Sequence, residues 1–311
     1  MIPRRSLLRT TLALVGGATL STGVTAGSAE STTASTQRDD TVTTAVATLE
    51  PSVIEVTGLP DPLDSLVADA RDRTRSLSLE DIASVTGRAA IHGDAVVGGR
   101  AVVTGSFDTQ AIESELRDHD LEFVAADRRD DGDSRFVASN DSYAVAVGPS
   151  AIRIGYGRTR SRARSRLDAA FEPLLPARRR TRPTASYGAL SALLDGHAVV
   201  YADLGSGTRS HLLDSLSDAP DELGTVVEAA NALGVALEAG SARTRLRYGV
   251  VADPARLSGE LLETLVDEAT TGDNSLSSAT IHRDGQTVIV DAAVETRSLW
   301  CAHERLVTDS S

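Results

Sequence analysis

Lysine is absent from the sequence, and all 31 basic residues of the 311-residue chain are arginine. A single cysteine rules out an internal disulfide framework. Aromatic residues make up only 3% of the chain, so the core must be built mainly from Val, Leu, Ile and Ala. Beyond the N-terminal segment, no apolar run reaches the roughly 20 residues that a membrane-spanning helix needs. The length still allows one large or two ordinary domains with a sizeable core.

Acidic residues outnumber basic ones, with 44 Asp and Glu giving a net charge of −13. Such a surface repels itself at low salt, and the repulsion is screened at about 1 M salt, where the Debye length is roughly 3 Å. Broad nucleic-acid binding is disfavoured, because it needs a net basic face that displaces counter-ions. The charge balance therefore predicts a salt-adapted protein with no nucleic-acid partner.

The whole-chain composition, Asp-rich, Lys-free and rich in Ala, Val and Thr, resembles that of proteins from extremely halophilic archaea. This resemblance implies an environment and no particular activity. An acidic exported protein from a mesophile with a GC-rich genome is the alternative interpretation.

The first 29 residues contain no acid and have the order of a targeting segment. Arg4-Arg5 precedes Ser6-Leu7-Leu8, an apolar run over Thr10–Thr19 and small residues ending at Ala29, which is the pattern of a cleavable signal. The Arg-Arg-x-Leu-Leu pattern resembles a twin-arginine export signal, an address read by the export machinery. A buried helix or a retained membrane anchor is the alternative. Removal of Arg4, Arg5 and Arg9 with the segment would lower the net charge by three, from −13 to −16.

These features together resemble the twin-arginine-exported proteins of extremely halophilic archaea. The resemblance implies an extracellular or cell-surface location. No cysteine lies near the cleavage region, so a lipid anchor is not expected.

Four segments are predicted. They are the signal peptide at residues 1–29, a Ser/Thr-rich linker at 30–48, an N-terminal unit at 49–183 and a C-terminal unit at 184–311. The boundary is placed at the Pro- and Arg-rich break that ends at Pro183.

Periodicity and turn signals predict a mixture of short strands and amphipathic helices. Strands are expected over 53–56, 121–126, 135–138, 143–147, 151–156, 197–203, 235–237, 245–251, 280–282 and 287–293. Helices are expected over 63–73, 158–174, 189–194, 209–216 and 222–233, and after Asp108 and Asp253; residues 79–82 form a short helix or a turn. Hairpin turns are expected at Gly93-Asp94, Gly98-Gly99, Gly240-Ser241 and Asp284-Gly285.

The two halves share a pattern. A shift of 145 residues places Asp108, a predicted helix N-cap, on Asp253, which precedes Pro254 at a predicted first helical position. We therefore predict the α+β class, with two pseudo-repeated units of antiparallel β-hairpins and amphipathic helices packed on one face.

The most unusual local feature is a cluster of nine arginines within 25 residues that contain only Asp168 and Glu172 as acids. Its members are Arg158, Arg160, Arg162, Arg164, Arg166, Arg178, Arg179, Arg180 and Arg182. These are candidate anion-binding residues for a lipid headgroup, a surface polysaccharide or an acidic protein. The alternative is an outer helix face whose guanidinium groups pair with acids of the same molecule.

No catalytic or metal-binding motif is found, and no cofactor is predicted. His92 and His282 are interpreted as turn residues, and Cys301 with His303 supplies too few ligands for a metal site. Gly205-Ser206-Gly207 lacks the lysine of a phosphate-binding loop and is interpreted as a tight strand-to-helix turn.

We predict a non-enzymatic binding or structural module. A secreted hydrolase with a dispersed site is the alternative, with His197, Asp203 and Ser206 as its candidate residues. A solute-binding protein is a third hypothesis.

Overall fold

The computed structural model describes residues 41–59, 76–118, 123–128, 133–138, 142–172, 186–216, 221–271 and 276–300. They belong to two compact units. The first contains the described parts of Val46–Ala89 and Val97–Thr181; the second contains those of Thr22–Ala45, Ala90–Val96 and Arg182–Ser311. The division after Thr181 falls close to the boundary expected at 183. The second unit also takes segments from the N-terminal half, so the units are not the contiguous halves predicted.

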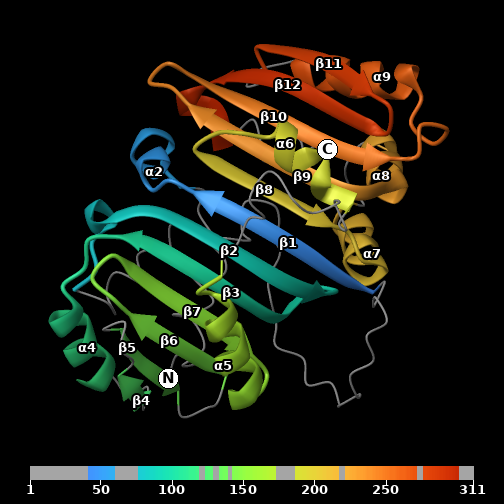
Figure 1. The fold of residues 1–311 in the computed structure, drawn as a ribbon. Helices are drawn as coiled ribbons and strands as arrows, with labels where there is room; N and C mark the ends of the chain where they lie inside the picture. The colour runs from blue at the N-terminus through green and yellow to red at the C-terminus, as the bar shows by residue number, and fades with distance from the viewer. Residues whose placement is uncertain are drawn as a thin grey trace. The chain divides into compact units, whose positions relative to one another are not determined.

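The first unit is built on antiparallel strands (Figure 1). Its strands follow one another in the order β2 (Ile82–His92), β3 (Ala95–Gly105), β7 (Ala151–Gly157), β6 (Tyr143–Val147), β5 (Ser134–Ala138) and β4 (Phe123–Arg128). Each neighbouring pair from β3 to β4 is antiparallel. Its helices are α2 (Ser52–Thr57), η1 (Leu79–Asp81), α4 (Thr109–Asp118) and α5 (Arg160–Ala169). The strands predicted over 121–156 are confirmed, with ends shifted by a few residues.

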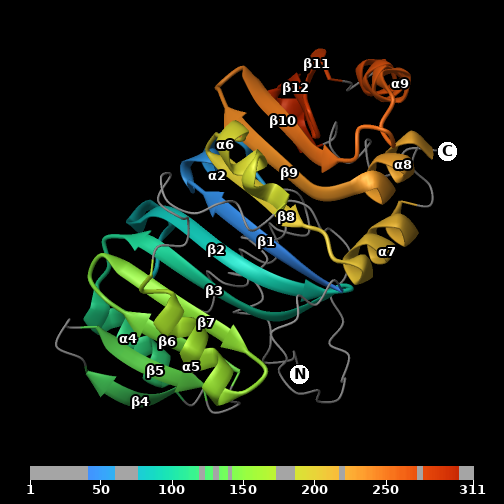
Figure 2. The same ribbon diagram turned by 45° about the vertical axis from the view of Figure 1, so that its right-hand side comes forward.

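Helices α4 and α5 cover opposite faces of this sheet. Val137 and Ala144 pack with Ala163 and Leu167 of α5. The preceding residue of β5, Phe136, has the guanidinium of Arg117 from α4 over its ring, 5.7 Å from the centroid. Because successive side chains of a strand point to opposite faces, α4 and α5 lie on either side of the sheet, as Figure 2 also shows. The prediction that the helices share one face is therefore wrong for this unit.

The second unit is also antiparallel, with strands in the order β11 (Ser278–Asp284), β12 (Thr287–Glu295), β10 (Arg243–Ala252), β9 (Ala230–Ala239) and β8 (Ala198–Asp203). Its helices are η2 (Ser186–Gly188), α6 (Leu190–Leu193), α7 (Ser206–Ser215), α8 (Asp221–Ala229), α9 (Gly259–Thr270) and η3 (Thr296–Ser298). The hairpin predicted about Gly240-Ser241 is confirmed by the β9–β10 pairing.

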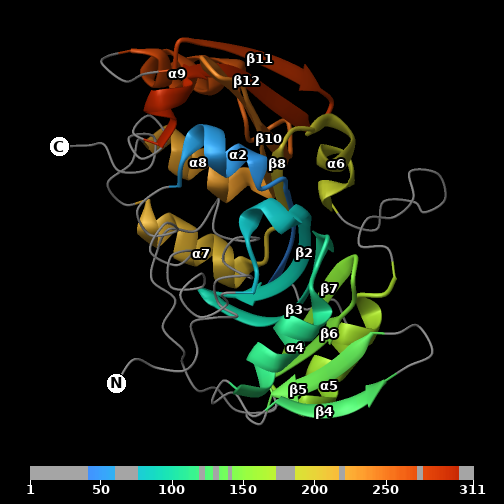
Figure 3. The ribbon, with the colours of Figure 1, turned by 90° about the vertical axis from the view of Figure 1, so that its left-hand side faces the viewer.

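In the second unit, too, helices lie on both faces (Figure 3). The main core joins Val226 of α8 and Leu262 of α9 to Val250 of β10. The preceding residue, Gly249, points to the other face, where a Cβ atom would lie 2.7 Å from Cδ2 of Leu190 in α6. The mixed α+β class is therefore confirmed, and the single helical face is again wrong.

Four local predictions need correction. Residues 42–48 are part of strand β1 (Val42–Leu49) rather than a linker, since β-branched Thr and Val suit a strand and Thr43 is buried. The segment expected as a strand at 53–56 is the single-turn helix α2. Gly98-Gly99 lies inside β3, where Gly98 faces Gly157 of β7, and forms no turn. The helix expected to continue to 233 ends at Ala229, where β9 begins directly.

The two aligned aspartates do different things. Asp108 accepts a hydrogen bond from the backbone N–H of Ala111 at 3.0 Å and starts α4, as predicted. Asp253 accepts from Ala255 in a turn at 3.0 Å, and α9 begins only at Gly259, where Ser258 accepts from Leu261 at 3.1 Å. The gap-free shift therefore does not align the helix starts, and Pro254 is not in the helix.

Several predictions fall outside the described residues. They concern the signal peptide at 1–29, the rest of the linker up to residue 40, the helix at 63–73, the arginines at 178–182, and Cys301 with His303.

Candidate anion-binding surface on helix α5

Helix α5 begins at a side-chain cap and packs through a narrow apolar stripe. The hydroxyl of Thr159 accepts from the backbone N–H of Arg162 at 3.4 Å. Ala163, Leu167 and Ala170, spaced by four and three residues, are buried against the sheet. Most other positions of the helix carry exposed side chains.

Glycines of β7 bring the helix backbone unusually close to the sheet. A Cβ atom on Gly155 would lie 2.3 Å from the carbonyl oxygen of Ala163 and from the backbone nitrogen of Leu167. A Cβ atom on Gly157 would lie 2.6 Å from Cβ of Arg162. Because backbone atoms cannot move aside as a side-chain tip can, only glycine fits at Gly155. We call Gly155 and Gly157 the glycine floor of α5.

The C-terminal end of α5 is held by a clamp around Phe171. The guanidinium groups of Arg135 and Arg153 lie 4.6 Å and 4.4 Å from the centre of the Phe171 ring. Arg135 also pairs with Asp168 of α5 at 2.7 Å, and Arg153 pairs with buried Asp133 at 2.9 Å. Arg135 of β5 and Arg153 of β7 are both paired with Ala146 of β6, which lies between them. The clamp therefore holds α5 over these three adjacent strands.

The outer face of α5 carries the arginines. Arg158, Arg160, Arg162, Arg164 and Arg166 are all exposed. Among the described residues, no ion pair is found for Arg158, Arg162, Arg164 or Arg166, whereas Asp168 is directed to Arg135 on the sheet. Four of the nine arginines in the predicted cluster therefore lie on α5 and Arg158 lies just before it, while the other four are outside the described residues.

This placement is electrostatically unfavourable for the isolated helix. Arg160 and Arg162 lie in the first turn, which contains no acid, although the N-terminal end of a helix favours negative charge. Within the helix, Arg160 and Arg164 are spaced by four residues, as are Arg162 and Arg166, and like charges at this spacing repel by a few tenths of a kcal/mol per pair. Within the described residues, no ion pair offsets this repulsion at Arg162, Arg164 or Arg166.

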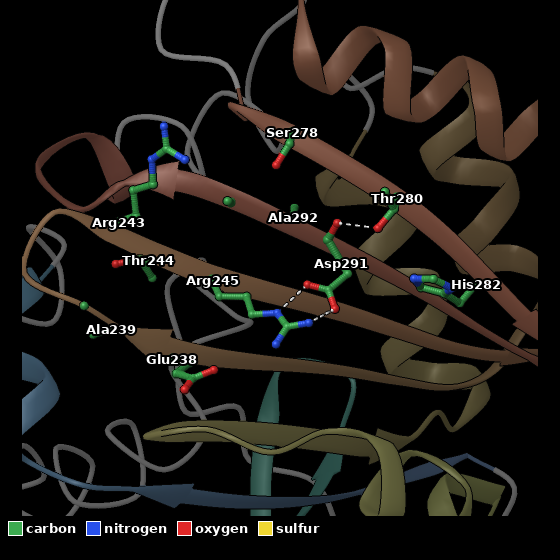
Figure 4. Close-up of a pocket in the computed structure, with 12 residues that line it drawn as sticks. Glu238, Ala239, Arg243, Thr244, Arg245, Ser278, Thr280, His282, Asp291 and Ala292 are labelled. Carbon is green, nitrogen blue, oxygen red and sulfur yellow. Dashed lines mark hydrogen bonds and ion pairs between the residues drawn. The ribbon is translucent and has the colours of Figure 1, made fainter.

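A second polar surface lies in the second unit, in an open groove of about 500 Å³ over β9 to β12 (Figure 4). Arg245 donates from Nε to the carboxylate of Asp291 at 2.6 Å, and Arg247 donates to the same carboxylate at 3.2 Å. The hydrogen bond from Arg245 lowers the pKa of Asp291, and the same bond raises the pKa of Arg245. The groove therefore has its central charges already paired.

The groove also receives His282, which sequence analysis interpreted as a turn residue. His282 lies within β11, opposite Ile289 of β12, and the hairpin turns at Gly285-Gln286 rather than at Asp284-Gly285. His92 does end β2 at the Gly93-Asp94 turn, as predicted. The groove was missed because its lining comes from three separate segments of sequence, and only their strand register brings the residues together.

The Gly205 loop has no room for a phosphate. A Cβ atom on Gly205 would lie 2.6 Å from backbone carbons of Thr41 and Val42, and the N–H of Gly205 donates to Thr43 at 2.9 Å. Thr208 donates to the carbonyl of Gly93 at 3.2 Å. The interpretation of this loop as a tight strand-to-helix turn is confirmed, since its glycine serves packing.

The candidate hydrolase residues are not assembled. His197 precedes β8 and accepts from the N–H of Ala239 at 3.1 Å, while Asp203 ends β8 and accepts from Tyr187 at 2.9 Å. Six residues of strand separate His197 from Asp203 by roughly 20 Å. Ser206 is exposed at the start of α7. These three residues therefore do not form a catalytic triad.

Within the described ranges, no group of three or more His, Cys, Asp and Glu side chains is placed to hold a metal ion. The same ranges contain no helix with the length and apolar character needed to cross a membrane.

Comparison with known proteins yields a distant structural likeness. No protein-family model matches the chain, and no curated protein matches it. Crystal forms III, I and IV of TP0453 give TM-scores of 0.49, 0.48 and 0.47 at 14%, 14% and 15% sequence identity. The alignments cover 84%, 85% and 84% of this chain and 94%, 94% and 92% of those chains. At this level of similarity the likeness carries no inference about function.

Proposed function

We propose that the protein is a non-enzymatic, exported binding module of a halophile, and that helix α5 contacts an anionic surface partner. The observation that carries the proposal is the outer face of α5, where five exposed arginines stand on, or just before, a helix that packs closely on its sheet. The partner is an anionic surface such as a polysaccharide or a lipid headgroup layer, and no nucleic acid is expected.

The contrast with other arginines supports this proposal. Arg117, Arg135, Arg153, Arg245, Arg247, Arg256 and Arg297 each pair with an acid at the protein surface or on a sheet. An excess of acids makes such pairing easy throughout this chain. Four exposed arginines without an acidic partner in the described part of α5 therefore favour an external anion over internal pairing.

High salt restricts the kind of contact that could work. At about 1 M salt, a charge is screened beyond roughly 3 Å, so long-range attraction contributes little. Direct hydrogen bonds from the guanidinium fork still form, and several of them on one rigid helix add together. The proposal thus requires a partner that presents closely spaced anionic groups.

A sedimentation assay tests the proposed function. The protein would be mixed in molar KCl with beads bearing dextran sulfate or with vesicles of anionic lipid. Replacing Arg158, Arg162 and Arg164 with Gln should reduce the bound fraction at least tenfold. A control of equal charge change, R243Q/R256Q/R297Q, removes three exposed arginines from the second unit, two of which pair with Glu228 and Glu295, and should bind as wild type. Equal binding by both triple variants would contradict the proposal.

Export and salt adaptation are supported by the Arg4-Arg5 signal pattern and by the acidic, Lys-free composition. Recovery of a processed protein from the medium or cell surface, with Arg4 replaced as the export-deficient control, tests the export route. Salt adaptation predicts a higher melting temperature in molar KCl than in dilute buffer. Equal melting temperatures would argue against it.

The pseudo-repeat is retained as a proposal with a new register. In each unit a hairpin (β2–β3 or β9–β10) leads to a helix and then to strands whose last member pairs with the second hairpin strand. The repeat would then relate strand order rather than a fixed shift of 145 residues. An alignment of related chains tests this, because glycines at matched strand positions should be kept in both halves.

A further inference from the structure

Two arginines meet at the edge of α5 that faces β3. The Nε and Nη2 atoms of Arg166 lie 3.8 Å and 3.9 Å from the position that a Cβ atom of Gly98 would occupy. Two residues further along β3, Arg100 donates from Nη1 to the carbonyl oxygen of Ala169, near the end of α5. Both guanidinium groups therefore lie where α5 packs against β3.

A third arginine, Arg88, adds to the positive charge of Arg100 and Arg166. The pKa of Arg100 is lowered, first by burial and then by the positive charges of Arg88 in β2 and Arg166. The negative charge of Glu172 acts in the opposite direction and raises the pKa of Arg100. Arg88 and Arg166 are exposed, and neither has an ion pair within the described residues. Ser84 of β2 shares a hydrogen bond with Thr104 of β3 at 2.7 Å, and four residues along this hairpin Arg88 lies next to Arg100 on the neighbouring strand.

Arg166 lies over a glycine of β3, so no β3 side chain separates its guanidinium group from the sheet. Gly98 of β3 pairs with Gly157 of β7, so two glycines face each other at this point of the sheet. The nearest atom to a Cβ on Gly98 is a backbone oxygen at 3.6 Å, which is ordinary contact distance. Both glycines are buried, Gly157 beneath the backbone of α5, so an anion would meet the outward-facing donors of Arg166 rather than the sheet itself.

We propose that Arg88, Arg100 and Arg166 bind a phosphate or sulfate group, the anionic group carried by the partner of α5. A tetrahedral oxyanion has several acceptor oxygens, and guanidinium forks converging from different elements match it better than they match a single carboxylate. Arg100 is held in place by the Ala169 carbonyl, and Arg88 and Arg166 supply exposed donors. The inference rests on the proposed function of α5 and gives the partner its chemistry.

Equilibrium dialysis of the full protein against labelled inorganic phosphate and sulfate in molar KCl tests this site. The variants R88Q and R166Q should each raise Kd about tenfold, as expected for the loss of one charge-assisted contact. Both side chains are exposed, so folding should be unaffected, which circular dichroism would verify. The control R256Q, an exposed arginine of the second unit, should leave Kd unchanged.

The same variants on dextran sulfate beads identify the source of the group. If R88Q and R166Q weaken the polymer and the free ion alike, the site takes the group from either source. If they weaken only the polymer, the site takes a polymer-linked ester. If they weaken neither, the site is disproved. In that case the α5 variant R158Q/R162Q/R164Q distinguishes the two proposals. If this variant loses bead binding, the proposed function of α5 stands although the phosphate or sulfate site does not.

Discussion

In each unit of the protein, one helix packs over a pair of glycines in the sheet. In the first unit, α5 lies on Gly155 and Gly157, with Gly157 paired to Gly98. In the second, α6 lies over Gly234 and Gly249, which pair with each other across β9 and β10. The shared feature is a helix packed over glycines, through its backbone in α5 and through leucine side chains in and next to α6, and it serves packing rather than binding.

The outer faces of the two helices differ. Helix α6 is a single turn, Leu190–Leu193, with no charged residue. Helix α5 is ten residues long and carries Arg160, Arg162, Arg164 and Arg166 outward, with Arg158 just before it. Both helices pack over glycines, but only α5 has an arginine-rich outer face. Packing on the sheet therefore does not explain the arginines of α5.

The largest effect is expected from Gly155→Ala. The new Cβ would lie 2.3 Å from backbone atoms of α5, so the helix must shift from the sheet. We expect a loss of about 3 kcal/mol in unfolding free energy, the upper end for overpacked sites, measured by urea denaturation. Gly224→Ala is the control, because nothing lies within 4 Å of that position in α8. An unchanged stability for the Gly155 variant would contradict the close backbone contact.

The corresponding change in the second unit should be milder. A Cβ on Gly249 would meet the side-chain tips of Leu190 at 2.7 Å and Ile289 at 3.2 Å, and both can rotate away. We expect Gly249→Ala to cost about 1.5 kcal/mol by the same assay, half the cost at Gly155. If the two substitutions lower the unfolding free energy equally, contact with helix backbone at Gly155 is no more restrictive than contact with side chains at Gly249, which would contradict this account.

A smaller effect is expected in the groove of the second unit, from Asp291→Asn. The carboxylate accepts from Arg245 and Arg247 in a solvent-open groove, so its loss should cost about 1 kcal/mol at neutral pH. The pKa of Asp291 is lowered in the folded state, so its contribution is present above the ordinary carboxyl pKa of 3.8 and is lost as pH falls through the folded value.

Denaturation at several pH values therefore checks the groove prediction. The stability difference between wild type and the Asp291 variant should shrink as pH falls below about 4. Asp195→Asn is a matched control, since Asp195 also pairs with Arg247 but is 81% exposed. A difference that stays constant down to low pH would show that the ion pair contributes nothing.

Local signals in the sequence predicted much of the fold. Asp108 as an N-cap, the Gly93-Asp94 turn and the ends of β6 depend only on neighbouring residues, and they are confirmed. Gly98-Gly99 has the same composition as a turn but lies in a strand, because its role is set by contact with Gly157 and Arg166. Val53–Val56 has strand-forming residues yet forms a helical turn.

The candidate surface was only partly visible in the sequence. Alternating arginines predicted an outer helix face, and α5 has one. The contributions of Arg88 and Arg100 could not be predicted, because they reach the same edge through strand pairing and a contact with Ala169. The clamp on Phe171 likewise depends on the register of β5, β6 and β7.

The smallest effect on stability, and the most direct test, is expected from R158Q/R162Q/R164Q. A thermal-shift measurement in molar KCl, with and without dextran sulfate, reads stability and binding together. Since surface substitutions without partners change stability by about 0.5 kcal/mol or less, the melting temperature of the free variant should equal that of wild type. The increase that dextran sulfate gives to wild type should disappear. A lower melting temperature in the free variant, with the dextran sulfate shift retained, would contradict the account and make the arginines of α5 structural.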